Sequence, residues 1–222
     1  LPQRKIKQST YVDVNKQPLN HFVMVATLNC NLLRRDFMNK LKASDNSWGL
    51  VTKIFHWFLT IILFWQIFTG FNLHNMEFSQ EKIGFIVIHK TIGTIIFVII
   101  ILRLLWRFYN TTPDSSSLPK LHKYASNLIH TLLYALVVWI PFQGTMMTQA
   151  GGYDVKILGL FTVPKFIETN TEMYPTFVQF HYQSMILLIV VFLIHLGAAI
   201  YHRFLNNDEY GIWKRMSFKI NK

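Results

Sequence analysis

Four long apolar segments constrain this chain more than any other feature of its sequence. They cover about residues 54–73, 83–106, 121–142 and 177–205. Each is near or above the ~20 residues that a helix needs to cross the hydrocarbon core of a bilayer. Because lipid cannot satisfy an open backbone, the segments are expected to be helices. A charged fraction of 15% is also low for a soluble domain. The sequence therefore predicts an all-α fold, an integral membrane four-helix bundle.

The basic residues indicate how this bundle is oriented. Eighteen of the 22 Lys and Arg residues precede the first segment, flank the connection between the second and third, or follow the fourth. Cytoplasmic connections carry such an excess, so both termini are expected in the cytoplasm. In a bacterium this predicts a multi-pass protein of the cell inner membrane. A net charge of +11 placed in this way argues for the lipid bilayer as partner, and against nucleic acid.

The whole chain is divided into three parts. Residues 1–46 show no clear period and no convincing signal peptide, so they are expected to be disordered or to reflect an over-extended gene start. Residues 47–216 form the expected transmembrane domain. Within it, residues 143–176 make an outer loop that is expected to fold over the mouth of the bundle. Residues 217–222 form a basic tail.

Histidines inside the segments carry the functional signal. His181 and His195 lie on the fourth segment, fourteen residues apart, so they differ by about 40° around the helix and by ~21 Å along it. His56 lies near the inner end of the first segment, and His89 lies near the outer end of the second. In the expected topology His89 faces His181 near the outer surface. At the same time His56 faces His195 near the inner surface.

Two opposed imidazoles in an apolar bundle suit a haem that is ligated from both sides. Zinc would need more ligands at each level, and the segments contain no acidic residue or cysteine. Cys30 is the only cysteine, so the pattern for covalent haem attachment is absent. Each histidine taken singly could be a packing residue with a hydrogen bond. Four histidines matched by depth instead predict two non-covalent haems.

Other polar residues of the segments allow two readings. Arg103 and Arg107, one turn apart at the inner end of the second segment, either reach the lipid head groups or pair with haem propionates. His202 is either a third polar level on the fourth segment or a residue at the wet inner surface. His130 is expected to be a hydrogen-bonded core residue, because it lies away from the register of the four histidines.

The ordered histidines sit within longer stretches of characteristic sequence. These stretches are KIFHWFLTIILFWQIFTG with His56, FIVIHKTIGTIIFVIIILRLLWR with His89, and FHYQSMILLIVVFLIHLGAAIYHRF with His181 and His195, followed by the weaker matches AGGYDVKILGLFTVP and EYGIWKRM. Over roughly residues 47–216 the chain resembles the bacterial cytochrome b561 family. The resemblance implies two haem b groups, ligated by His56 with His195 and by His89 with His181. It also implies electron transport in a respiratory chain, between the quinone pool and a partner at the outer face.

The resemblance leaves the outer electron donor or acceptor open. One branch of the family oxidises superoxide, which an electropositive outer mouth would favour. The outer connections here carry four basic residues against five acidic ones, so superoxide is one candidate without support from charge. On the inner side, His202 is a candidate for contacting the quinone or handling its protons, because imidazole titrates near neutral pH.

Two other classes of function fit parts of the sequence. The chain could be a cytochrome b subunit that carries electrons for a larger membrane dehydrogenase or hydrogenase, instead of a quinone-linked oxidoreductase in its own right. It could also be a haem-free transporter that uses buried histidines. The transporter reading gives no reason for histidines paired by depth.

Overall fold

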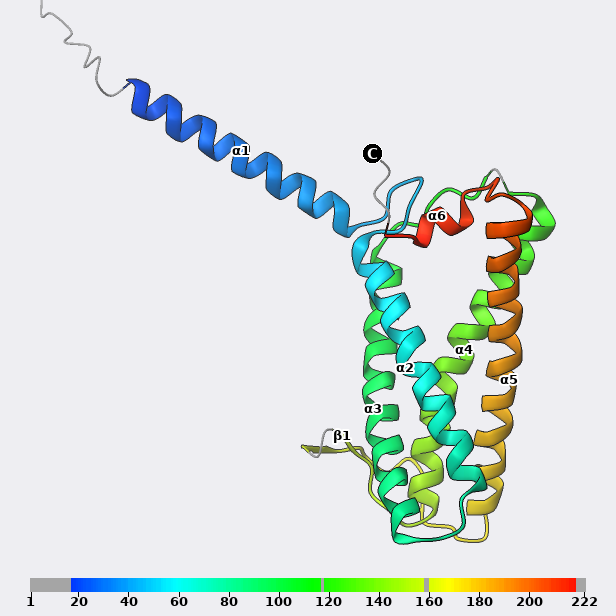
Figure 1. Ribbon diagram of the computed structural model, residues 1–222. Helices are drawn as coiled ribbons and strands as arrows, with labels where there is room; N and C mark the ends of the chain where they lie inside the picture. Colours follow the sequence, from blue (N-terminus) through cyan, green and yellow to red (C-terminus); the bar gives the residue numbers. More distant parts are fainter. Residues whose placement is uncertain (1–16, 117, 158–159, 219–222) are drawn as a thin grey trace, which may run out of the picture. The chain divides into compact units, whose positions relative to one another are not determined.

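The computed structural model describes residues 17–116, 118–157 and 160–218. Within them, four helices are long and apolar enough to cross a membrane. They are α2 (Leu50–Asn75), α3 (Gln80–Tyr109), α4 (Lys120–Ala150) and α5 (Tyr174–Ile200), and α5 continues as the π-helical turn η1 (Tyr201–Leu205) (Figure 1). Helix α5 packs most extensively on α4, and α3 packs on α2 and α4. The prediction of an all-α fold is confirmed, with helices consistent with a four-span membrane bundle.

Helix α4 extends further than the sequence suggested. The third apolar segment was expected to end at residue 142, next to Pro141, but the helix continues to Ala150, so residues 143–150 are helical and do not belong to a loop. Proline is tolerated inside membrane helices, where neighbouring helices and side chains satisfy the freed backbone groups. The group that Pro141 leaves free is the carbonyl of Val137, because proline has no N–H to donate to it. The expected outer loop therefore begins only after Ala150.

This outer loop is tied to the end of α4. It contains a short antiparallel hairpin of β1 (Lys156–Ile157) and β2 (Phe161–Thr162). Gln149, 2% exposed, donates to the carbonyl of Pro164 at 2.8 Å and accepts from the amide of Phe166 at 2.9 Å. A buried amide that bonds two loop backbone groups fixes the loop's return path.

A second short segment closes the end of the bundle that the distribution of basic residues predicts to be the inner end. Residues after η1 turn back into α6 (Ile212–Met216). The buried carboxylate of Asp208 accepts from the amides of Trp213 at 2.8 Å and Lys214 at 3.2 Å, and so caps the first turn of α6. Lys53 of α2 donates to the carbonyl of Ser217 at 2.8 Å, which holds the end of α6 against the bundle.

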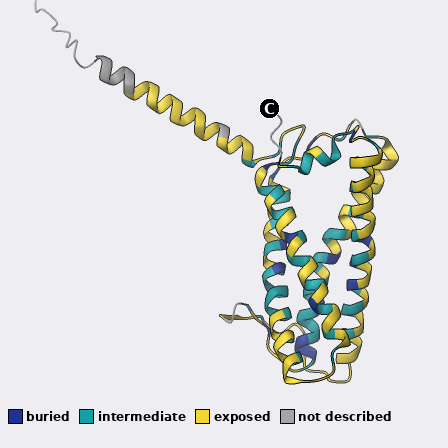
Figure 2. Ribbon diagram, in the orientation of Figure 1, coloured by how far each residue is buried: buried dark blue, intermediate teal, exposed yellow. Residues whose placement is uncertain are grey.

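The packed core consists of two apolar clusters. Leu59, Ile96 and Ile100 join α2 to α3, and a second cluster of Leu136, Leu188 and Val191 joins α4 to α5. Figure 2 shows the buried residues where helices meet, and long exposed faces elsewhere on the helices. Those faces carry many large apolar side chains. Lipid is the solvent that such faces fit, because acyl chains are as apolar as the side chains.

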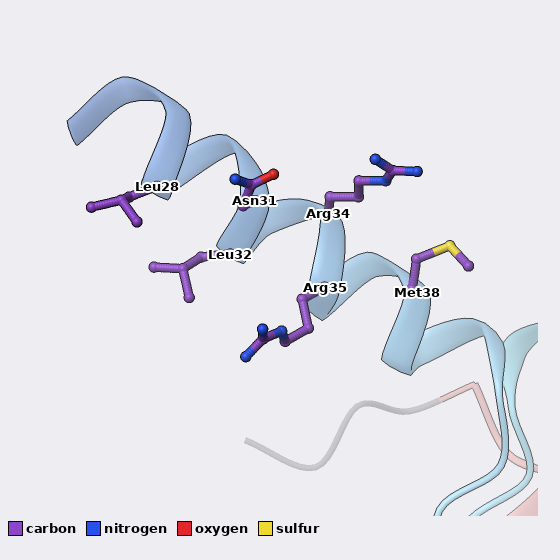
Figure 3. Close-up of a pocket in the computed structure, with 6 residues that line it drawn as sticks. All are labelled: Leu28, Asn31, Leu32, Arg34, Arg35 and Met38. Atoms are coloured by element: carbon purple, nitrogen blue, oxygen red, sulfur yellow. The ribbon is translucent and has the colours of Figure 1, made fainter. Parts of the chain in front are cut away.

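One further helix, α1 (Gln17–Leu41), precedes the bundle and forms a separate unit of the chain. Residues 1–46 were predicted to be disordered or to reflect an over-extended gene start; residues 17–41 of this range are helical, and residues 1–16 lie outside the described residues. A shallow hollow on α1 is lined by Leu28, Asn31, Leu32, Arg34, Arg35 and Met38 (Figure 3). All six residues come from this one helix, so the hollow is a feature of the helix surface and does not resemble an enclosed cofactor site.

Candidate functional site

The structure brings the four predicted histidines together in two pairs. The first pair, called the outer pair after the orientation expected from the basic residues, joins His89 of α3 to His181 of α5, with ring centroids 6.4 Å apart and planes inclined by 82°. In the inner pair, His56 of α2 faces His195 of α5, with centroids 6.3 Å apart and planes inclined by 72°. Each pair joins two different helices, as the sequence analysis expected.

The spacing of the rings can be compared with what a shared metal requires. A metal bound at about 2 Å from one nitrogen of each imidazole holds the two ring centroids roughly 6 Å apart. Both pairs have this separation. Among the described residues, no group of three or more His, Cys, Asp or Glu side chains could hold a metal ion. The donor set therefore suits a metal that brings its own equatorial ligands, as a haem iron does.

Two glycines leave space beside the outer pair. A Cβ added to Gly70 of α2 would come within 3.1 Å of His89 Cε1. A Cβ added to Gly144 of α4 would come within 3.3 Å of His181 Cε1. These distances are tighter than ordinary van der Waals contact, so any larger residue would push against a ring. At these two positions α2 and α4, which carry no histidine of the outer pair, thus leave room for the rings.

Polar contacts hold His89 in place from α2. Gln66 Nε2 donates to the backbone carbonyl of His89 at 2.8 Å, and Thr69 Oγ1 lies 3.1 Å from His89 Nδ1. The Nδ1 atom of His181 is buried and has no hydrogen-bond partner among the described residues. The two rings of the outer pair therefore differ in their support: side chains of α2 contact His89, whereas the backbone of Ile140 on α4 interacts with His181. Thr69 and Gln66 were not identified from the sequence, because threonine and glutamine are ordinary residues of a membrane helix.

Further polar side chains lie around the inner pair. Arg103 Nη2 lies 3.4 Å from His56 Nδ1, and its guanidinium carbon lies 5.4 Å from the centroid of the Tyr134 ring. His130 lies beside His195, with centroids 5.2 Å apart. The prediction that His130 lies away from the histidine register is wrong. Its expected hydrogen bond is present, because Ser126 Oγ lies 3.3 Å from His130 Nδ1. Its depth on α4, near the inner end, was the signal that could have identified it.

The two arginines at the inner end of α3 have different neighbours. Arg103 reaches the inner pair, whereas Arg107 places its guanidinium carbon 5.0 Å from the centroid of the Trp48 ring, outside the four spanning helices. The Nε atom of Arg103 is buried without a hydrogen-bond partner in the described part of the chain. Of the two arginines, only Arg103 contacts a histidine of either pair among the interactions described.

His202 belongs to neither pair. It lies on η1, with its ring centroid 5.6 Å from that of His122 and 6.3 Å from that of Tyr210. Its Nδ1 atom is buried and lacks a hydrogen-bond partner among the described residues. The structure therefore groups His202 with polar rings at the inner end of the bundle, apart from the two facing pairs.

Comparison with known proteins agrees with this arrangement. The family model described as prokaryotic cytochrome b561 matches residues 47–219, most of the chain. The chain is also 23% identical, over 166 residues, to cytochrome b561 homolog 2 of Escherichia coli (strain K12), a match that covers 73% of this chain and 87% of that protein. Members of the matched family are membrane electron-transport proteins that typically bind haem b. With four helices of membrane-spanning length and a family match over most of its residues, this chain belongs to the prokaryotic cytochrome b561 family.

Proposed function

We propose that this protein is a membrane di-haem b-type cytochrome that transfers electrons between the quinone pool and a partner at the outer face of the bacterial inner membrane. One observation carries the proposal: two pairs of imidazoles face each other at ring separations of 6.3 and 6.4 Å. Haem, when bound, supplies reversible one-electron chemistry. Superoxide is one candidate for the outer partner.

The two pairs indicate which histidines would bind each haem. His89 and His181 would hold the outer haem, and His56 and His195 the inner haem. The names outer and inner follow from the distribution of basic residues, which favours cytoplasmic termini. Two haem sites are needed because the hydrocarbon core is insulating. His181 and His195 lie fourteen residues apart, about 21 Å along α5, so each site serves one side of the core.

Arg103 is proposed to bind a propionate of the inner haem. A guanidinium only donates hydrogen bonds, and an imidazole that binds iron through Nε2 carries its proton on Nδ1. Arg103 therefore cannot donate to His56 Nδ1 once His56 is a ligand. The four apolar segments contain no Asp or Glu to take its place. A carboxylate of the cofactor, which a guanidinium binds well, supplies the missing partner. Arg107 is a second candidate for the same role.

Quinone is proposed to bind at the inner end, near His202. The oxygens of a quinone accept hydrogen bonds, and His202 Nδ1 is a buried polar atom without a partner among the described residues. His122 and Tyr210 lie around the same ring. His202→Ala should slow quinone turnover while both haems remain bound. Unchanged turnover would remove His202 from the quinone site.

The proposal is tested by a reduced-minus-oxidised spectrum and a haem-to-protein ratio on the purified full chain. We expect a b-type spectrum and two haems for each chain. His89→Ala and His181→Ala should each remove one haem and leave the other, and so should His56→Ala and His195→Ala. A colourless preparation, or retention of both haems after each of these substitutions, would overturn the proposal.

A further inference from the structure

Three residues of one face of α2 hold His89 of the neighbouring helix. Gln66 bonds the backbone carbonyl of His89, Thr69 contacts the ring nitrogen Nδ1, and Gly70 leaves room for the ring carbon Cε1. Positions three and four residues apart lie on the same side of a helix, so the three contacts form one continuous surface. Thr69 is 6% exposed, so water has little access to its hydroxyl.

The hydroxyl of Thr69 has two neighbours and one hydrogen. It donates to the carbonyl of Gln66 at 3.0 Å, because that oxygen can only accept. Towards His89 Nδ1, at 3.1 Å, the hydroxyl then acts as the acceptor. This direction requires the proton of the neutral imidazole to sit on Nδ1. The lone pair is consequently on Nε2, the nitrogen that faces away from this contact.

His181, the other ring of the outer pair, has no equivalent side-chain contact; the backbone of Ile140 is the group that interacts with it. His181 Nδ1 is buried without a hydrogen-bond partner in the described part of the chain. The inner pair differs as well, since the neighbour of His56 Nδ1 is the guanidinium of Arg103, which cannot accept. Among the side-chain contacts described for these three rings, that of Thr69 is the one that selects the tautomer that binds a metal through Nε2.

We propose that Thr69 is the positioning residue of the outer haem site: its hydroxyl fixes the ring orientation and the Nδ1-protonated tautomer of His89, and thereby sets the midpoint potential of the outer haem. The inference rests on the proposed function. A hydrogen bond accepted from the far nitrogen of a ligating imidazole makes the ligating nitrogen more basic. A more basic ligand favours the oxidised iron, so the contact lowers the midpoint potential of the outer site.

The experiment compares substitutions at Thr69 in the purified full chain. Thr69→Val keeps the shape of the side chain and removes the hydroxyl, whereas Thr69→Ser keeps the hydroxyl. Thr94→Val is the matched control, because the hydroxyl of Thr94 donates to the carbonyl of Lys90 on its own helix at 2.8 Å. Redox titrations monitored by haem absorbance should resolve two transitions. His89→Ala and His181→Ala identify the outer one.

Thr69→Val should raise the midpoint potential of the outer transition and leave the inner one unchanged. Loss of such a supporting contact costs about 10- to 100-fold in metal affinity, so outer haem retention should also fall. Thr69→Ser should restore both properties, and Thr94→Val should behave as wild type. Equal outer potentials in wild type and Thr69→Val, or a Thr69→Ser protein that resembles Thr69→Val, would overturn the inference.

Failure of the inference can be told apart from failure of the proposed function. If the wild-type chain binds two haems and the histidine substitutions each remove one, the proposed function stands whatever Thr69 does. If Thr69→Val does not accumulate, Thr69→Ala and Thr69→Ser provide the same comparison. A lower outer potential in Thr69→Ala than in Thr69→Ser has the wrong sign and contradicts the inference.

Discussion

Gly144 on α4 lies directly against the ring of His181 on α5, so that a Cβ at this position would approach His181 Cε1 to 3.3 Å. The helix that contributes no ligand to the outer pair therefore still shapes the space around it. On α2, Gly70 leaves room for the ring of His89 in the same way. The outer site is thus defined by two histidines and by two positions where side chains are absent.

Gly144→Ala should weaken the outer haem selectively. The added methyl must displace the ring of His181, and such overpacking costs about 1–3 kcal/mol. Haem-to-protein ratios and redox titrations should show partial loss or a shifted potential of the outer haem, with the inner haem unchanged. Gly84→Ala is the control, since no atom lies within 4 Å of its added Cβ. Full outer loading with an unchanged spectrum in Gly144→Ala would contradict this account of the site.

Double substitutions test how the histidines are paired. If His56 and His195 hold the same haem, the double substitution to Ala should lose one haem, as each single substitution does. If His56 and His181 serve different haems, their double substitution should lose both. The effects of substitutions at residues that bind the same group are not additive, whereas the effects of substitutions at distant sites are. Haem content of the four single and the double variants measures this directly. One remaining haem in the His56/His181 variant would indicate a different pairing.

The helices and their facing histidines could be predicted because lipid imposes simple rules. Apolar length gives the spans, and the distribution of basic residues gives their expected direction. Depth then determines which histidines can meet, as for His89 with His181. Helix ends were harder to predict. Pro141 suggested that the third helix ends there, but a proline is tolerated within a membrane helix bundle, and α4 continues past it.

The finer parts of the site depend on rotation about the helix axis, which depth alone does not give. His130 has the depth of His195, yet its contact with that ring follows from the packing of α4 on α5. Arg103 and Arg107 look equivalent in sequence, but only the first faces the histidines. Thr69 could not be distinguished from other membrane threonines until its distance to His89 Nδ1 was known.

Asp208→Ala should loosen the inner end of the bundle without removing either haem. The buried carboxylate accepts from the amides of Trp213 and Lys214, and loss of a helix cap costs about 0.5–2 kcal/mol. Hydrogen–deuterium exchange of residues 212–217 should become faster. Glu209→Ala serves as the control, because the adjacent side chain is exposed. Equal exchange in the two variants would show that the cap contributes little.

Arg103→Gln should lower the midpoint potential of the inner haem. Arg103 lies beside the inner pair, 3.4 Å from His56 Nδ1 in this structure. A cation next to the inner haem favours the reduced, less positive iron, and its removal also leaves a bound propionate without its partner. Redox titration should show a shift of the inner transition alone, and Arg103→Lys, which keeps the charge but not the fork of donors, should shift it less. Arg107→Gln is the comparison, because Arg107 stacks on Trp48. A larger inner shift from Arg107→Gln than from Arg103→Gln would assign the electrostatic role to Arg107 instead.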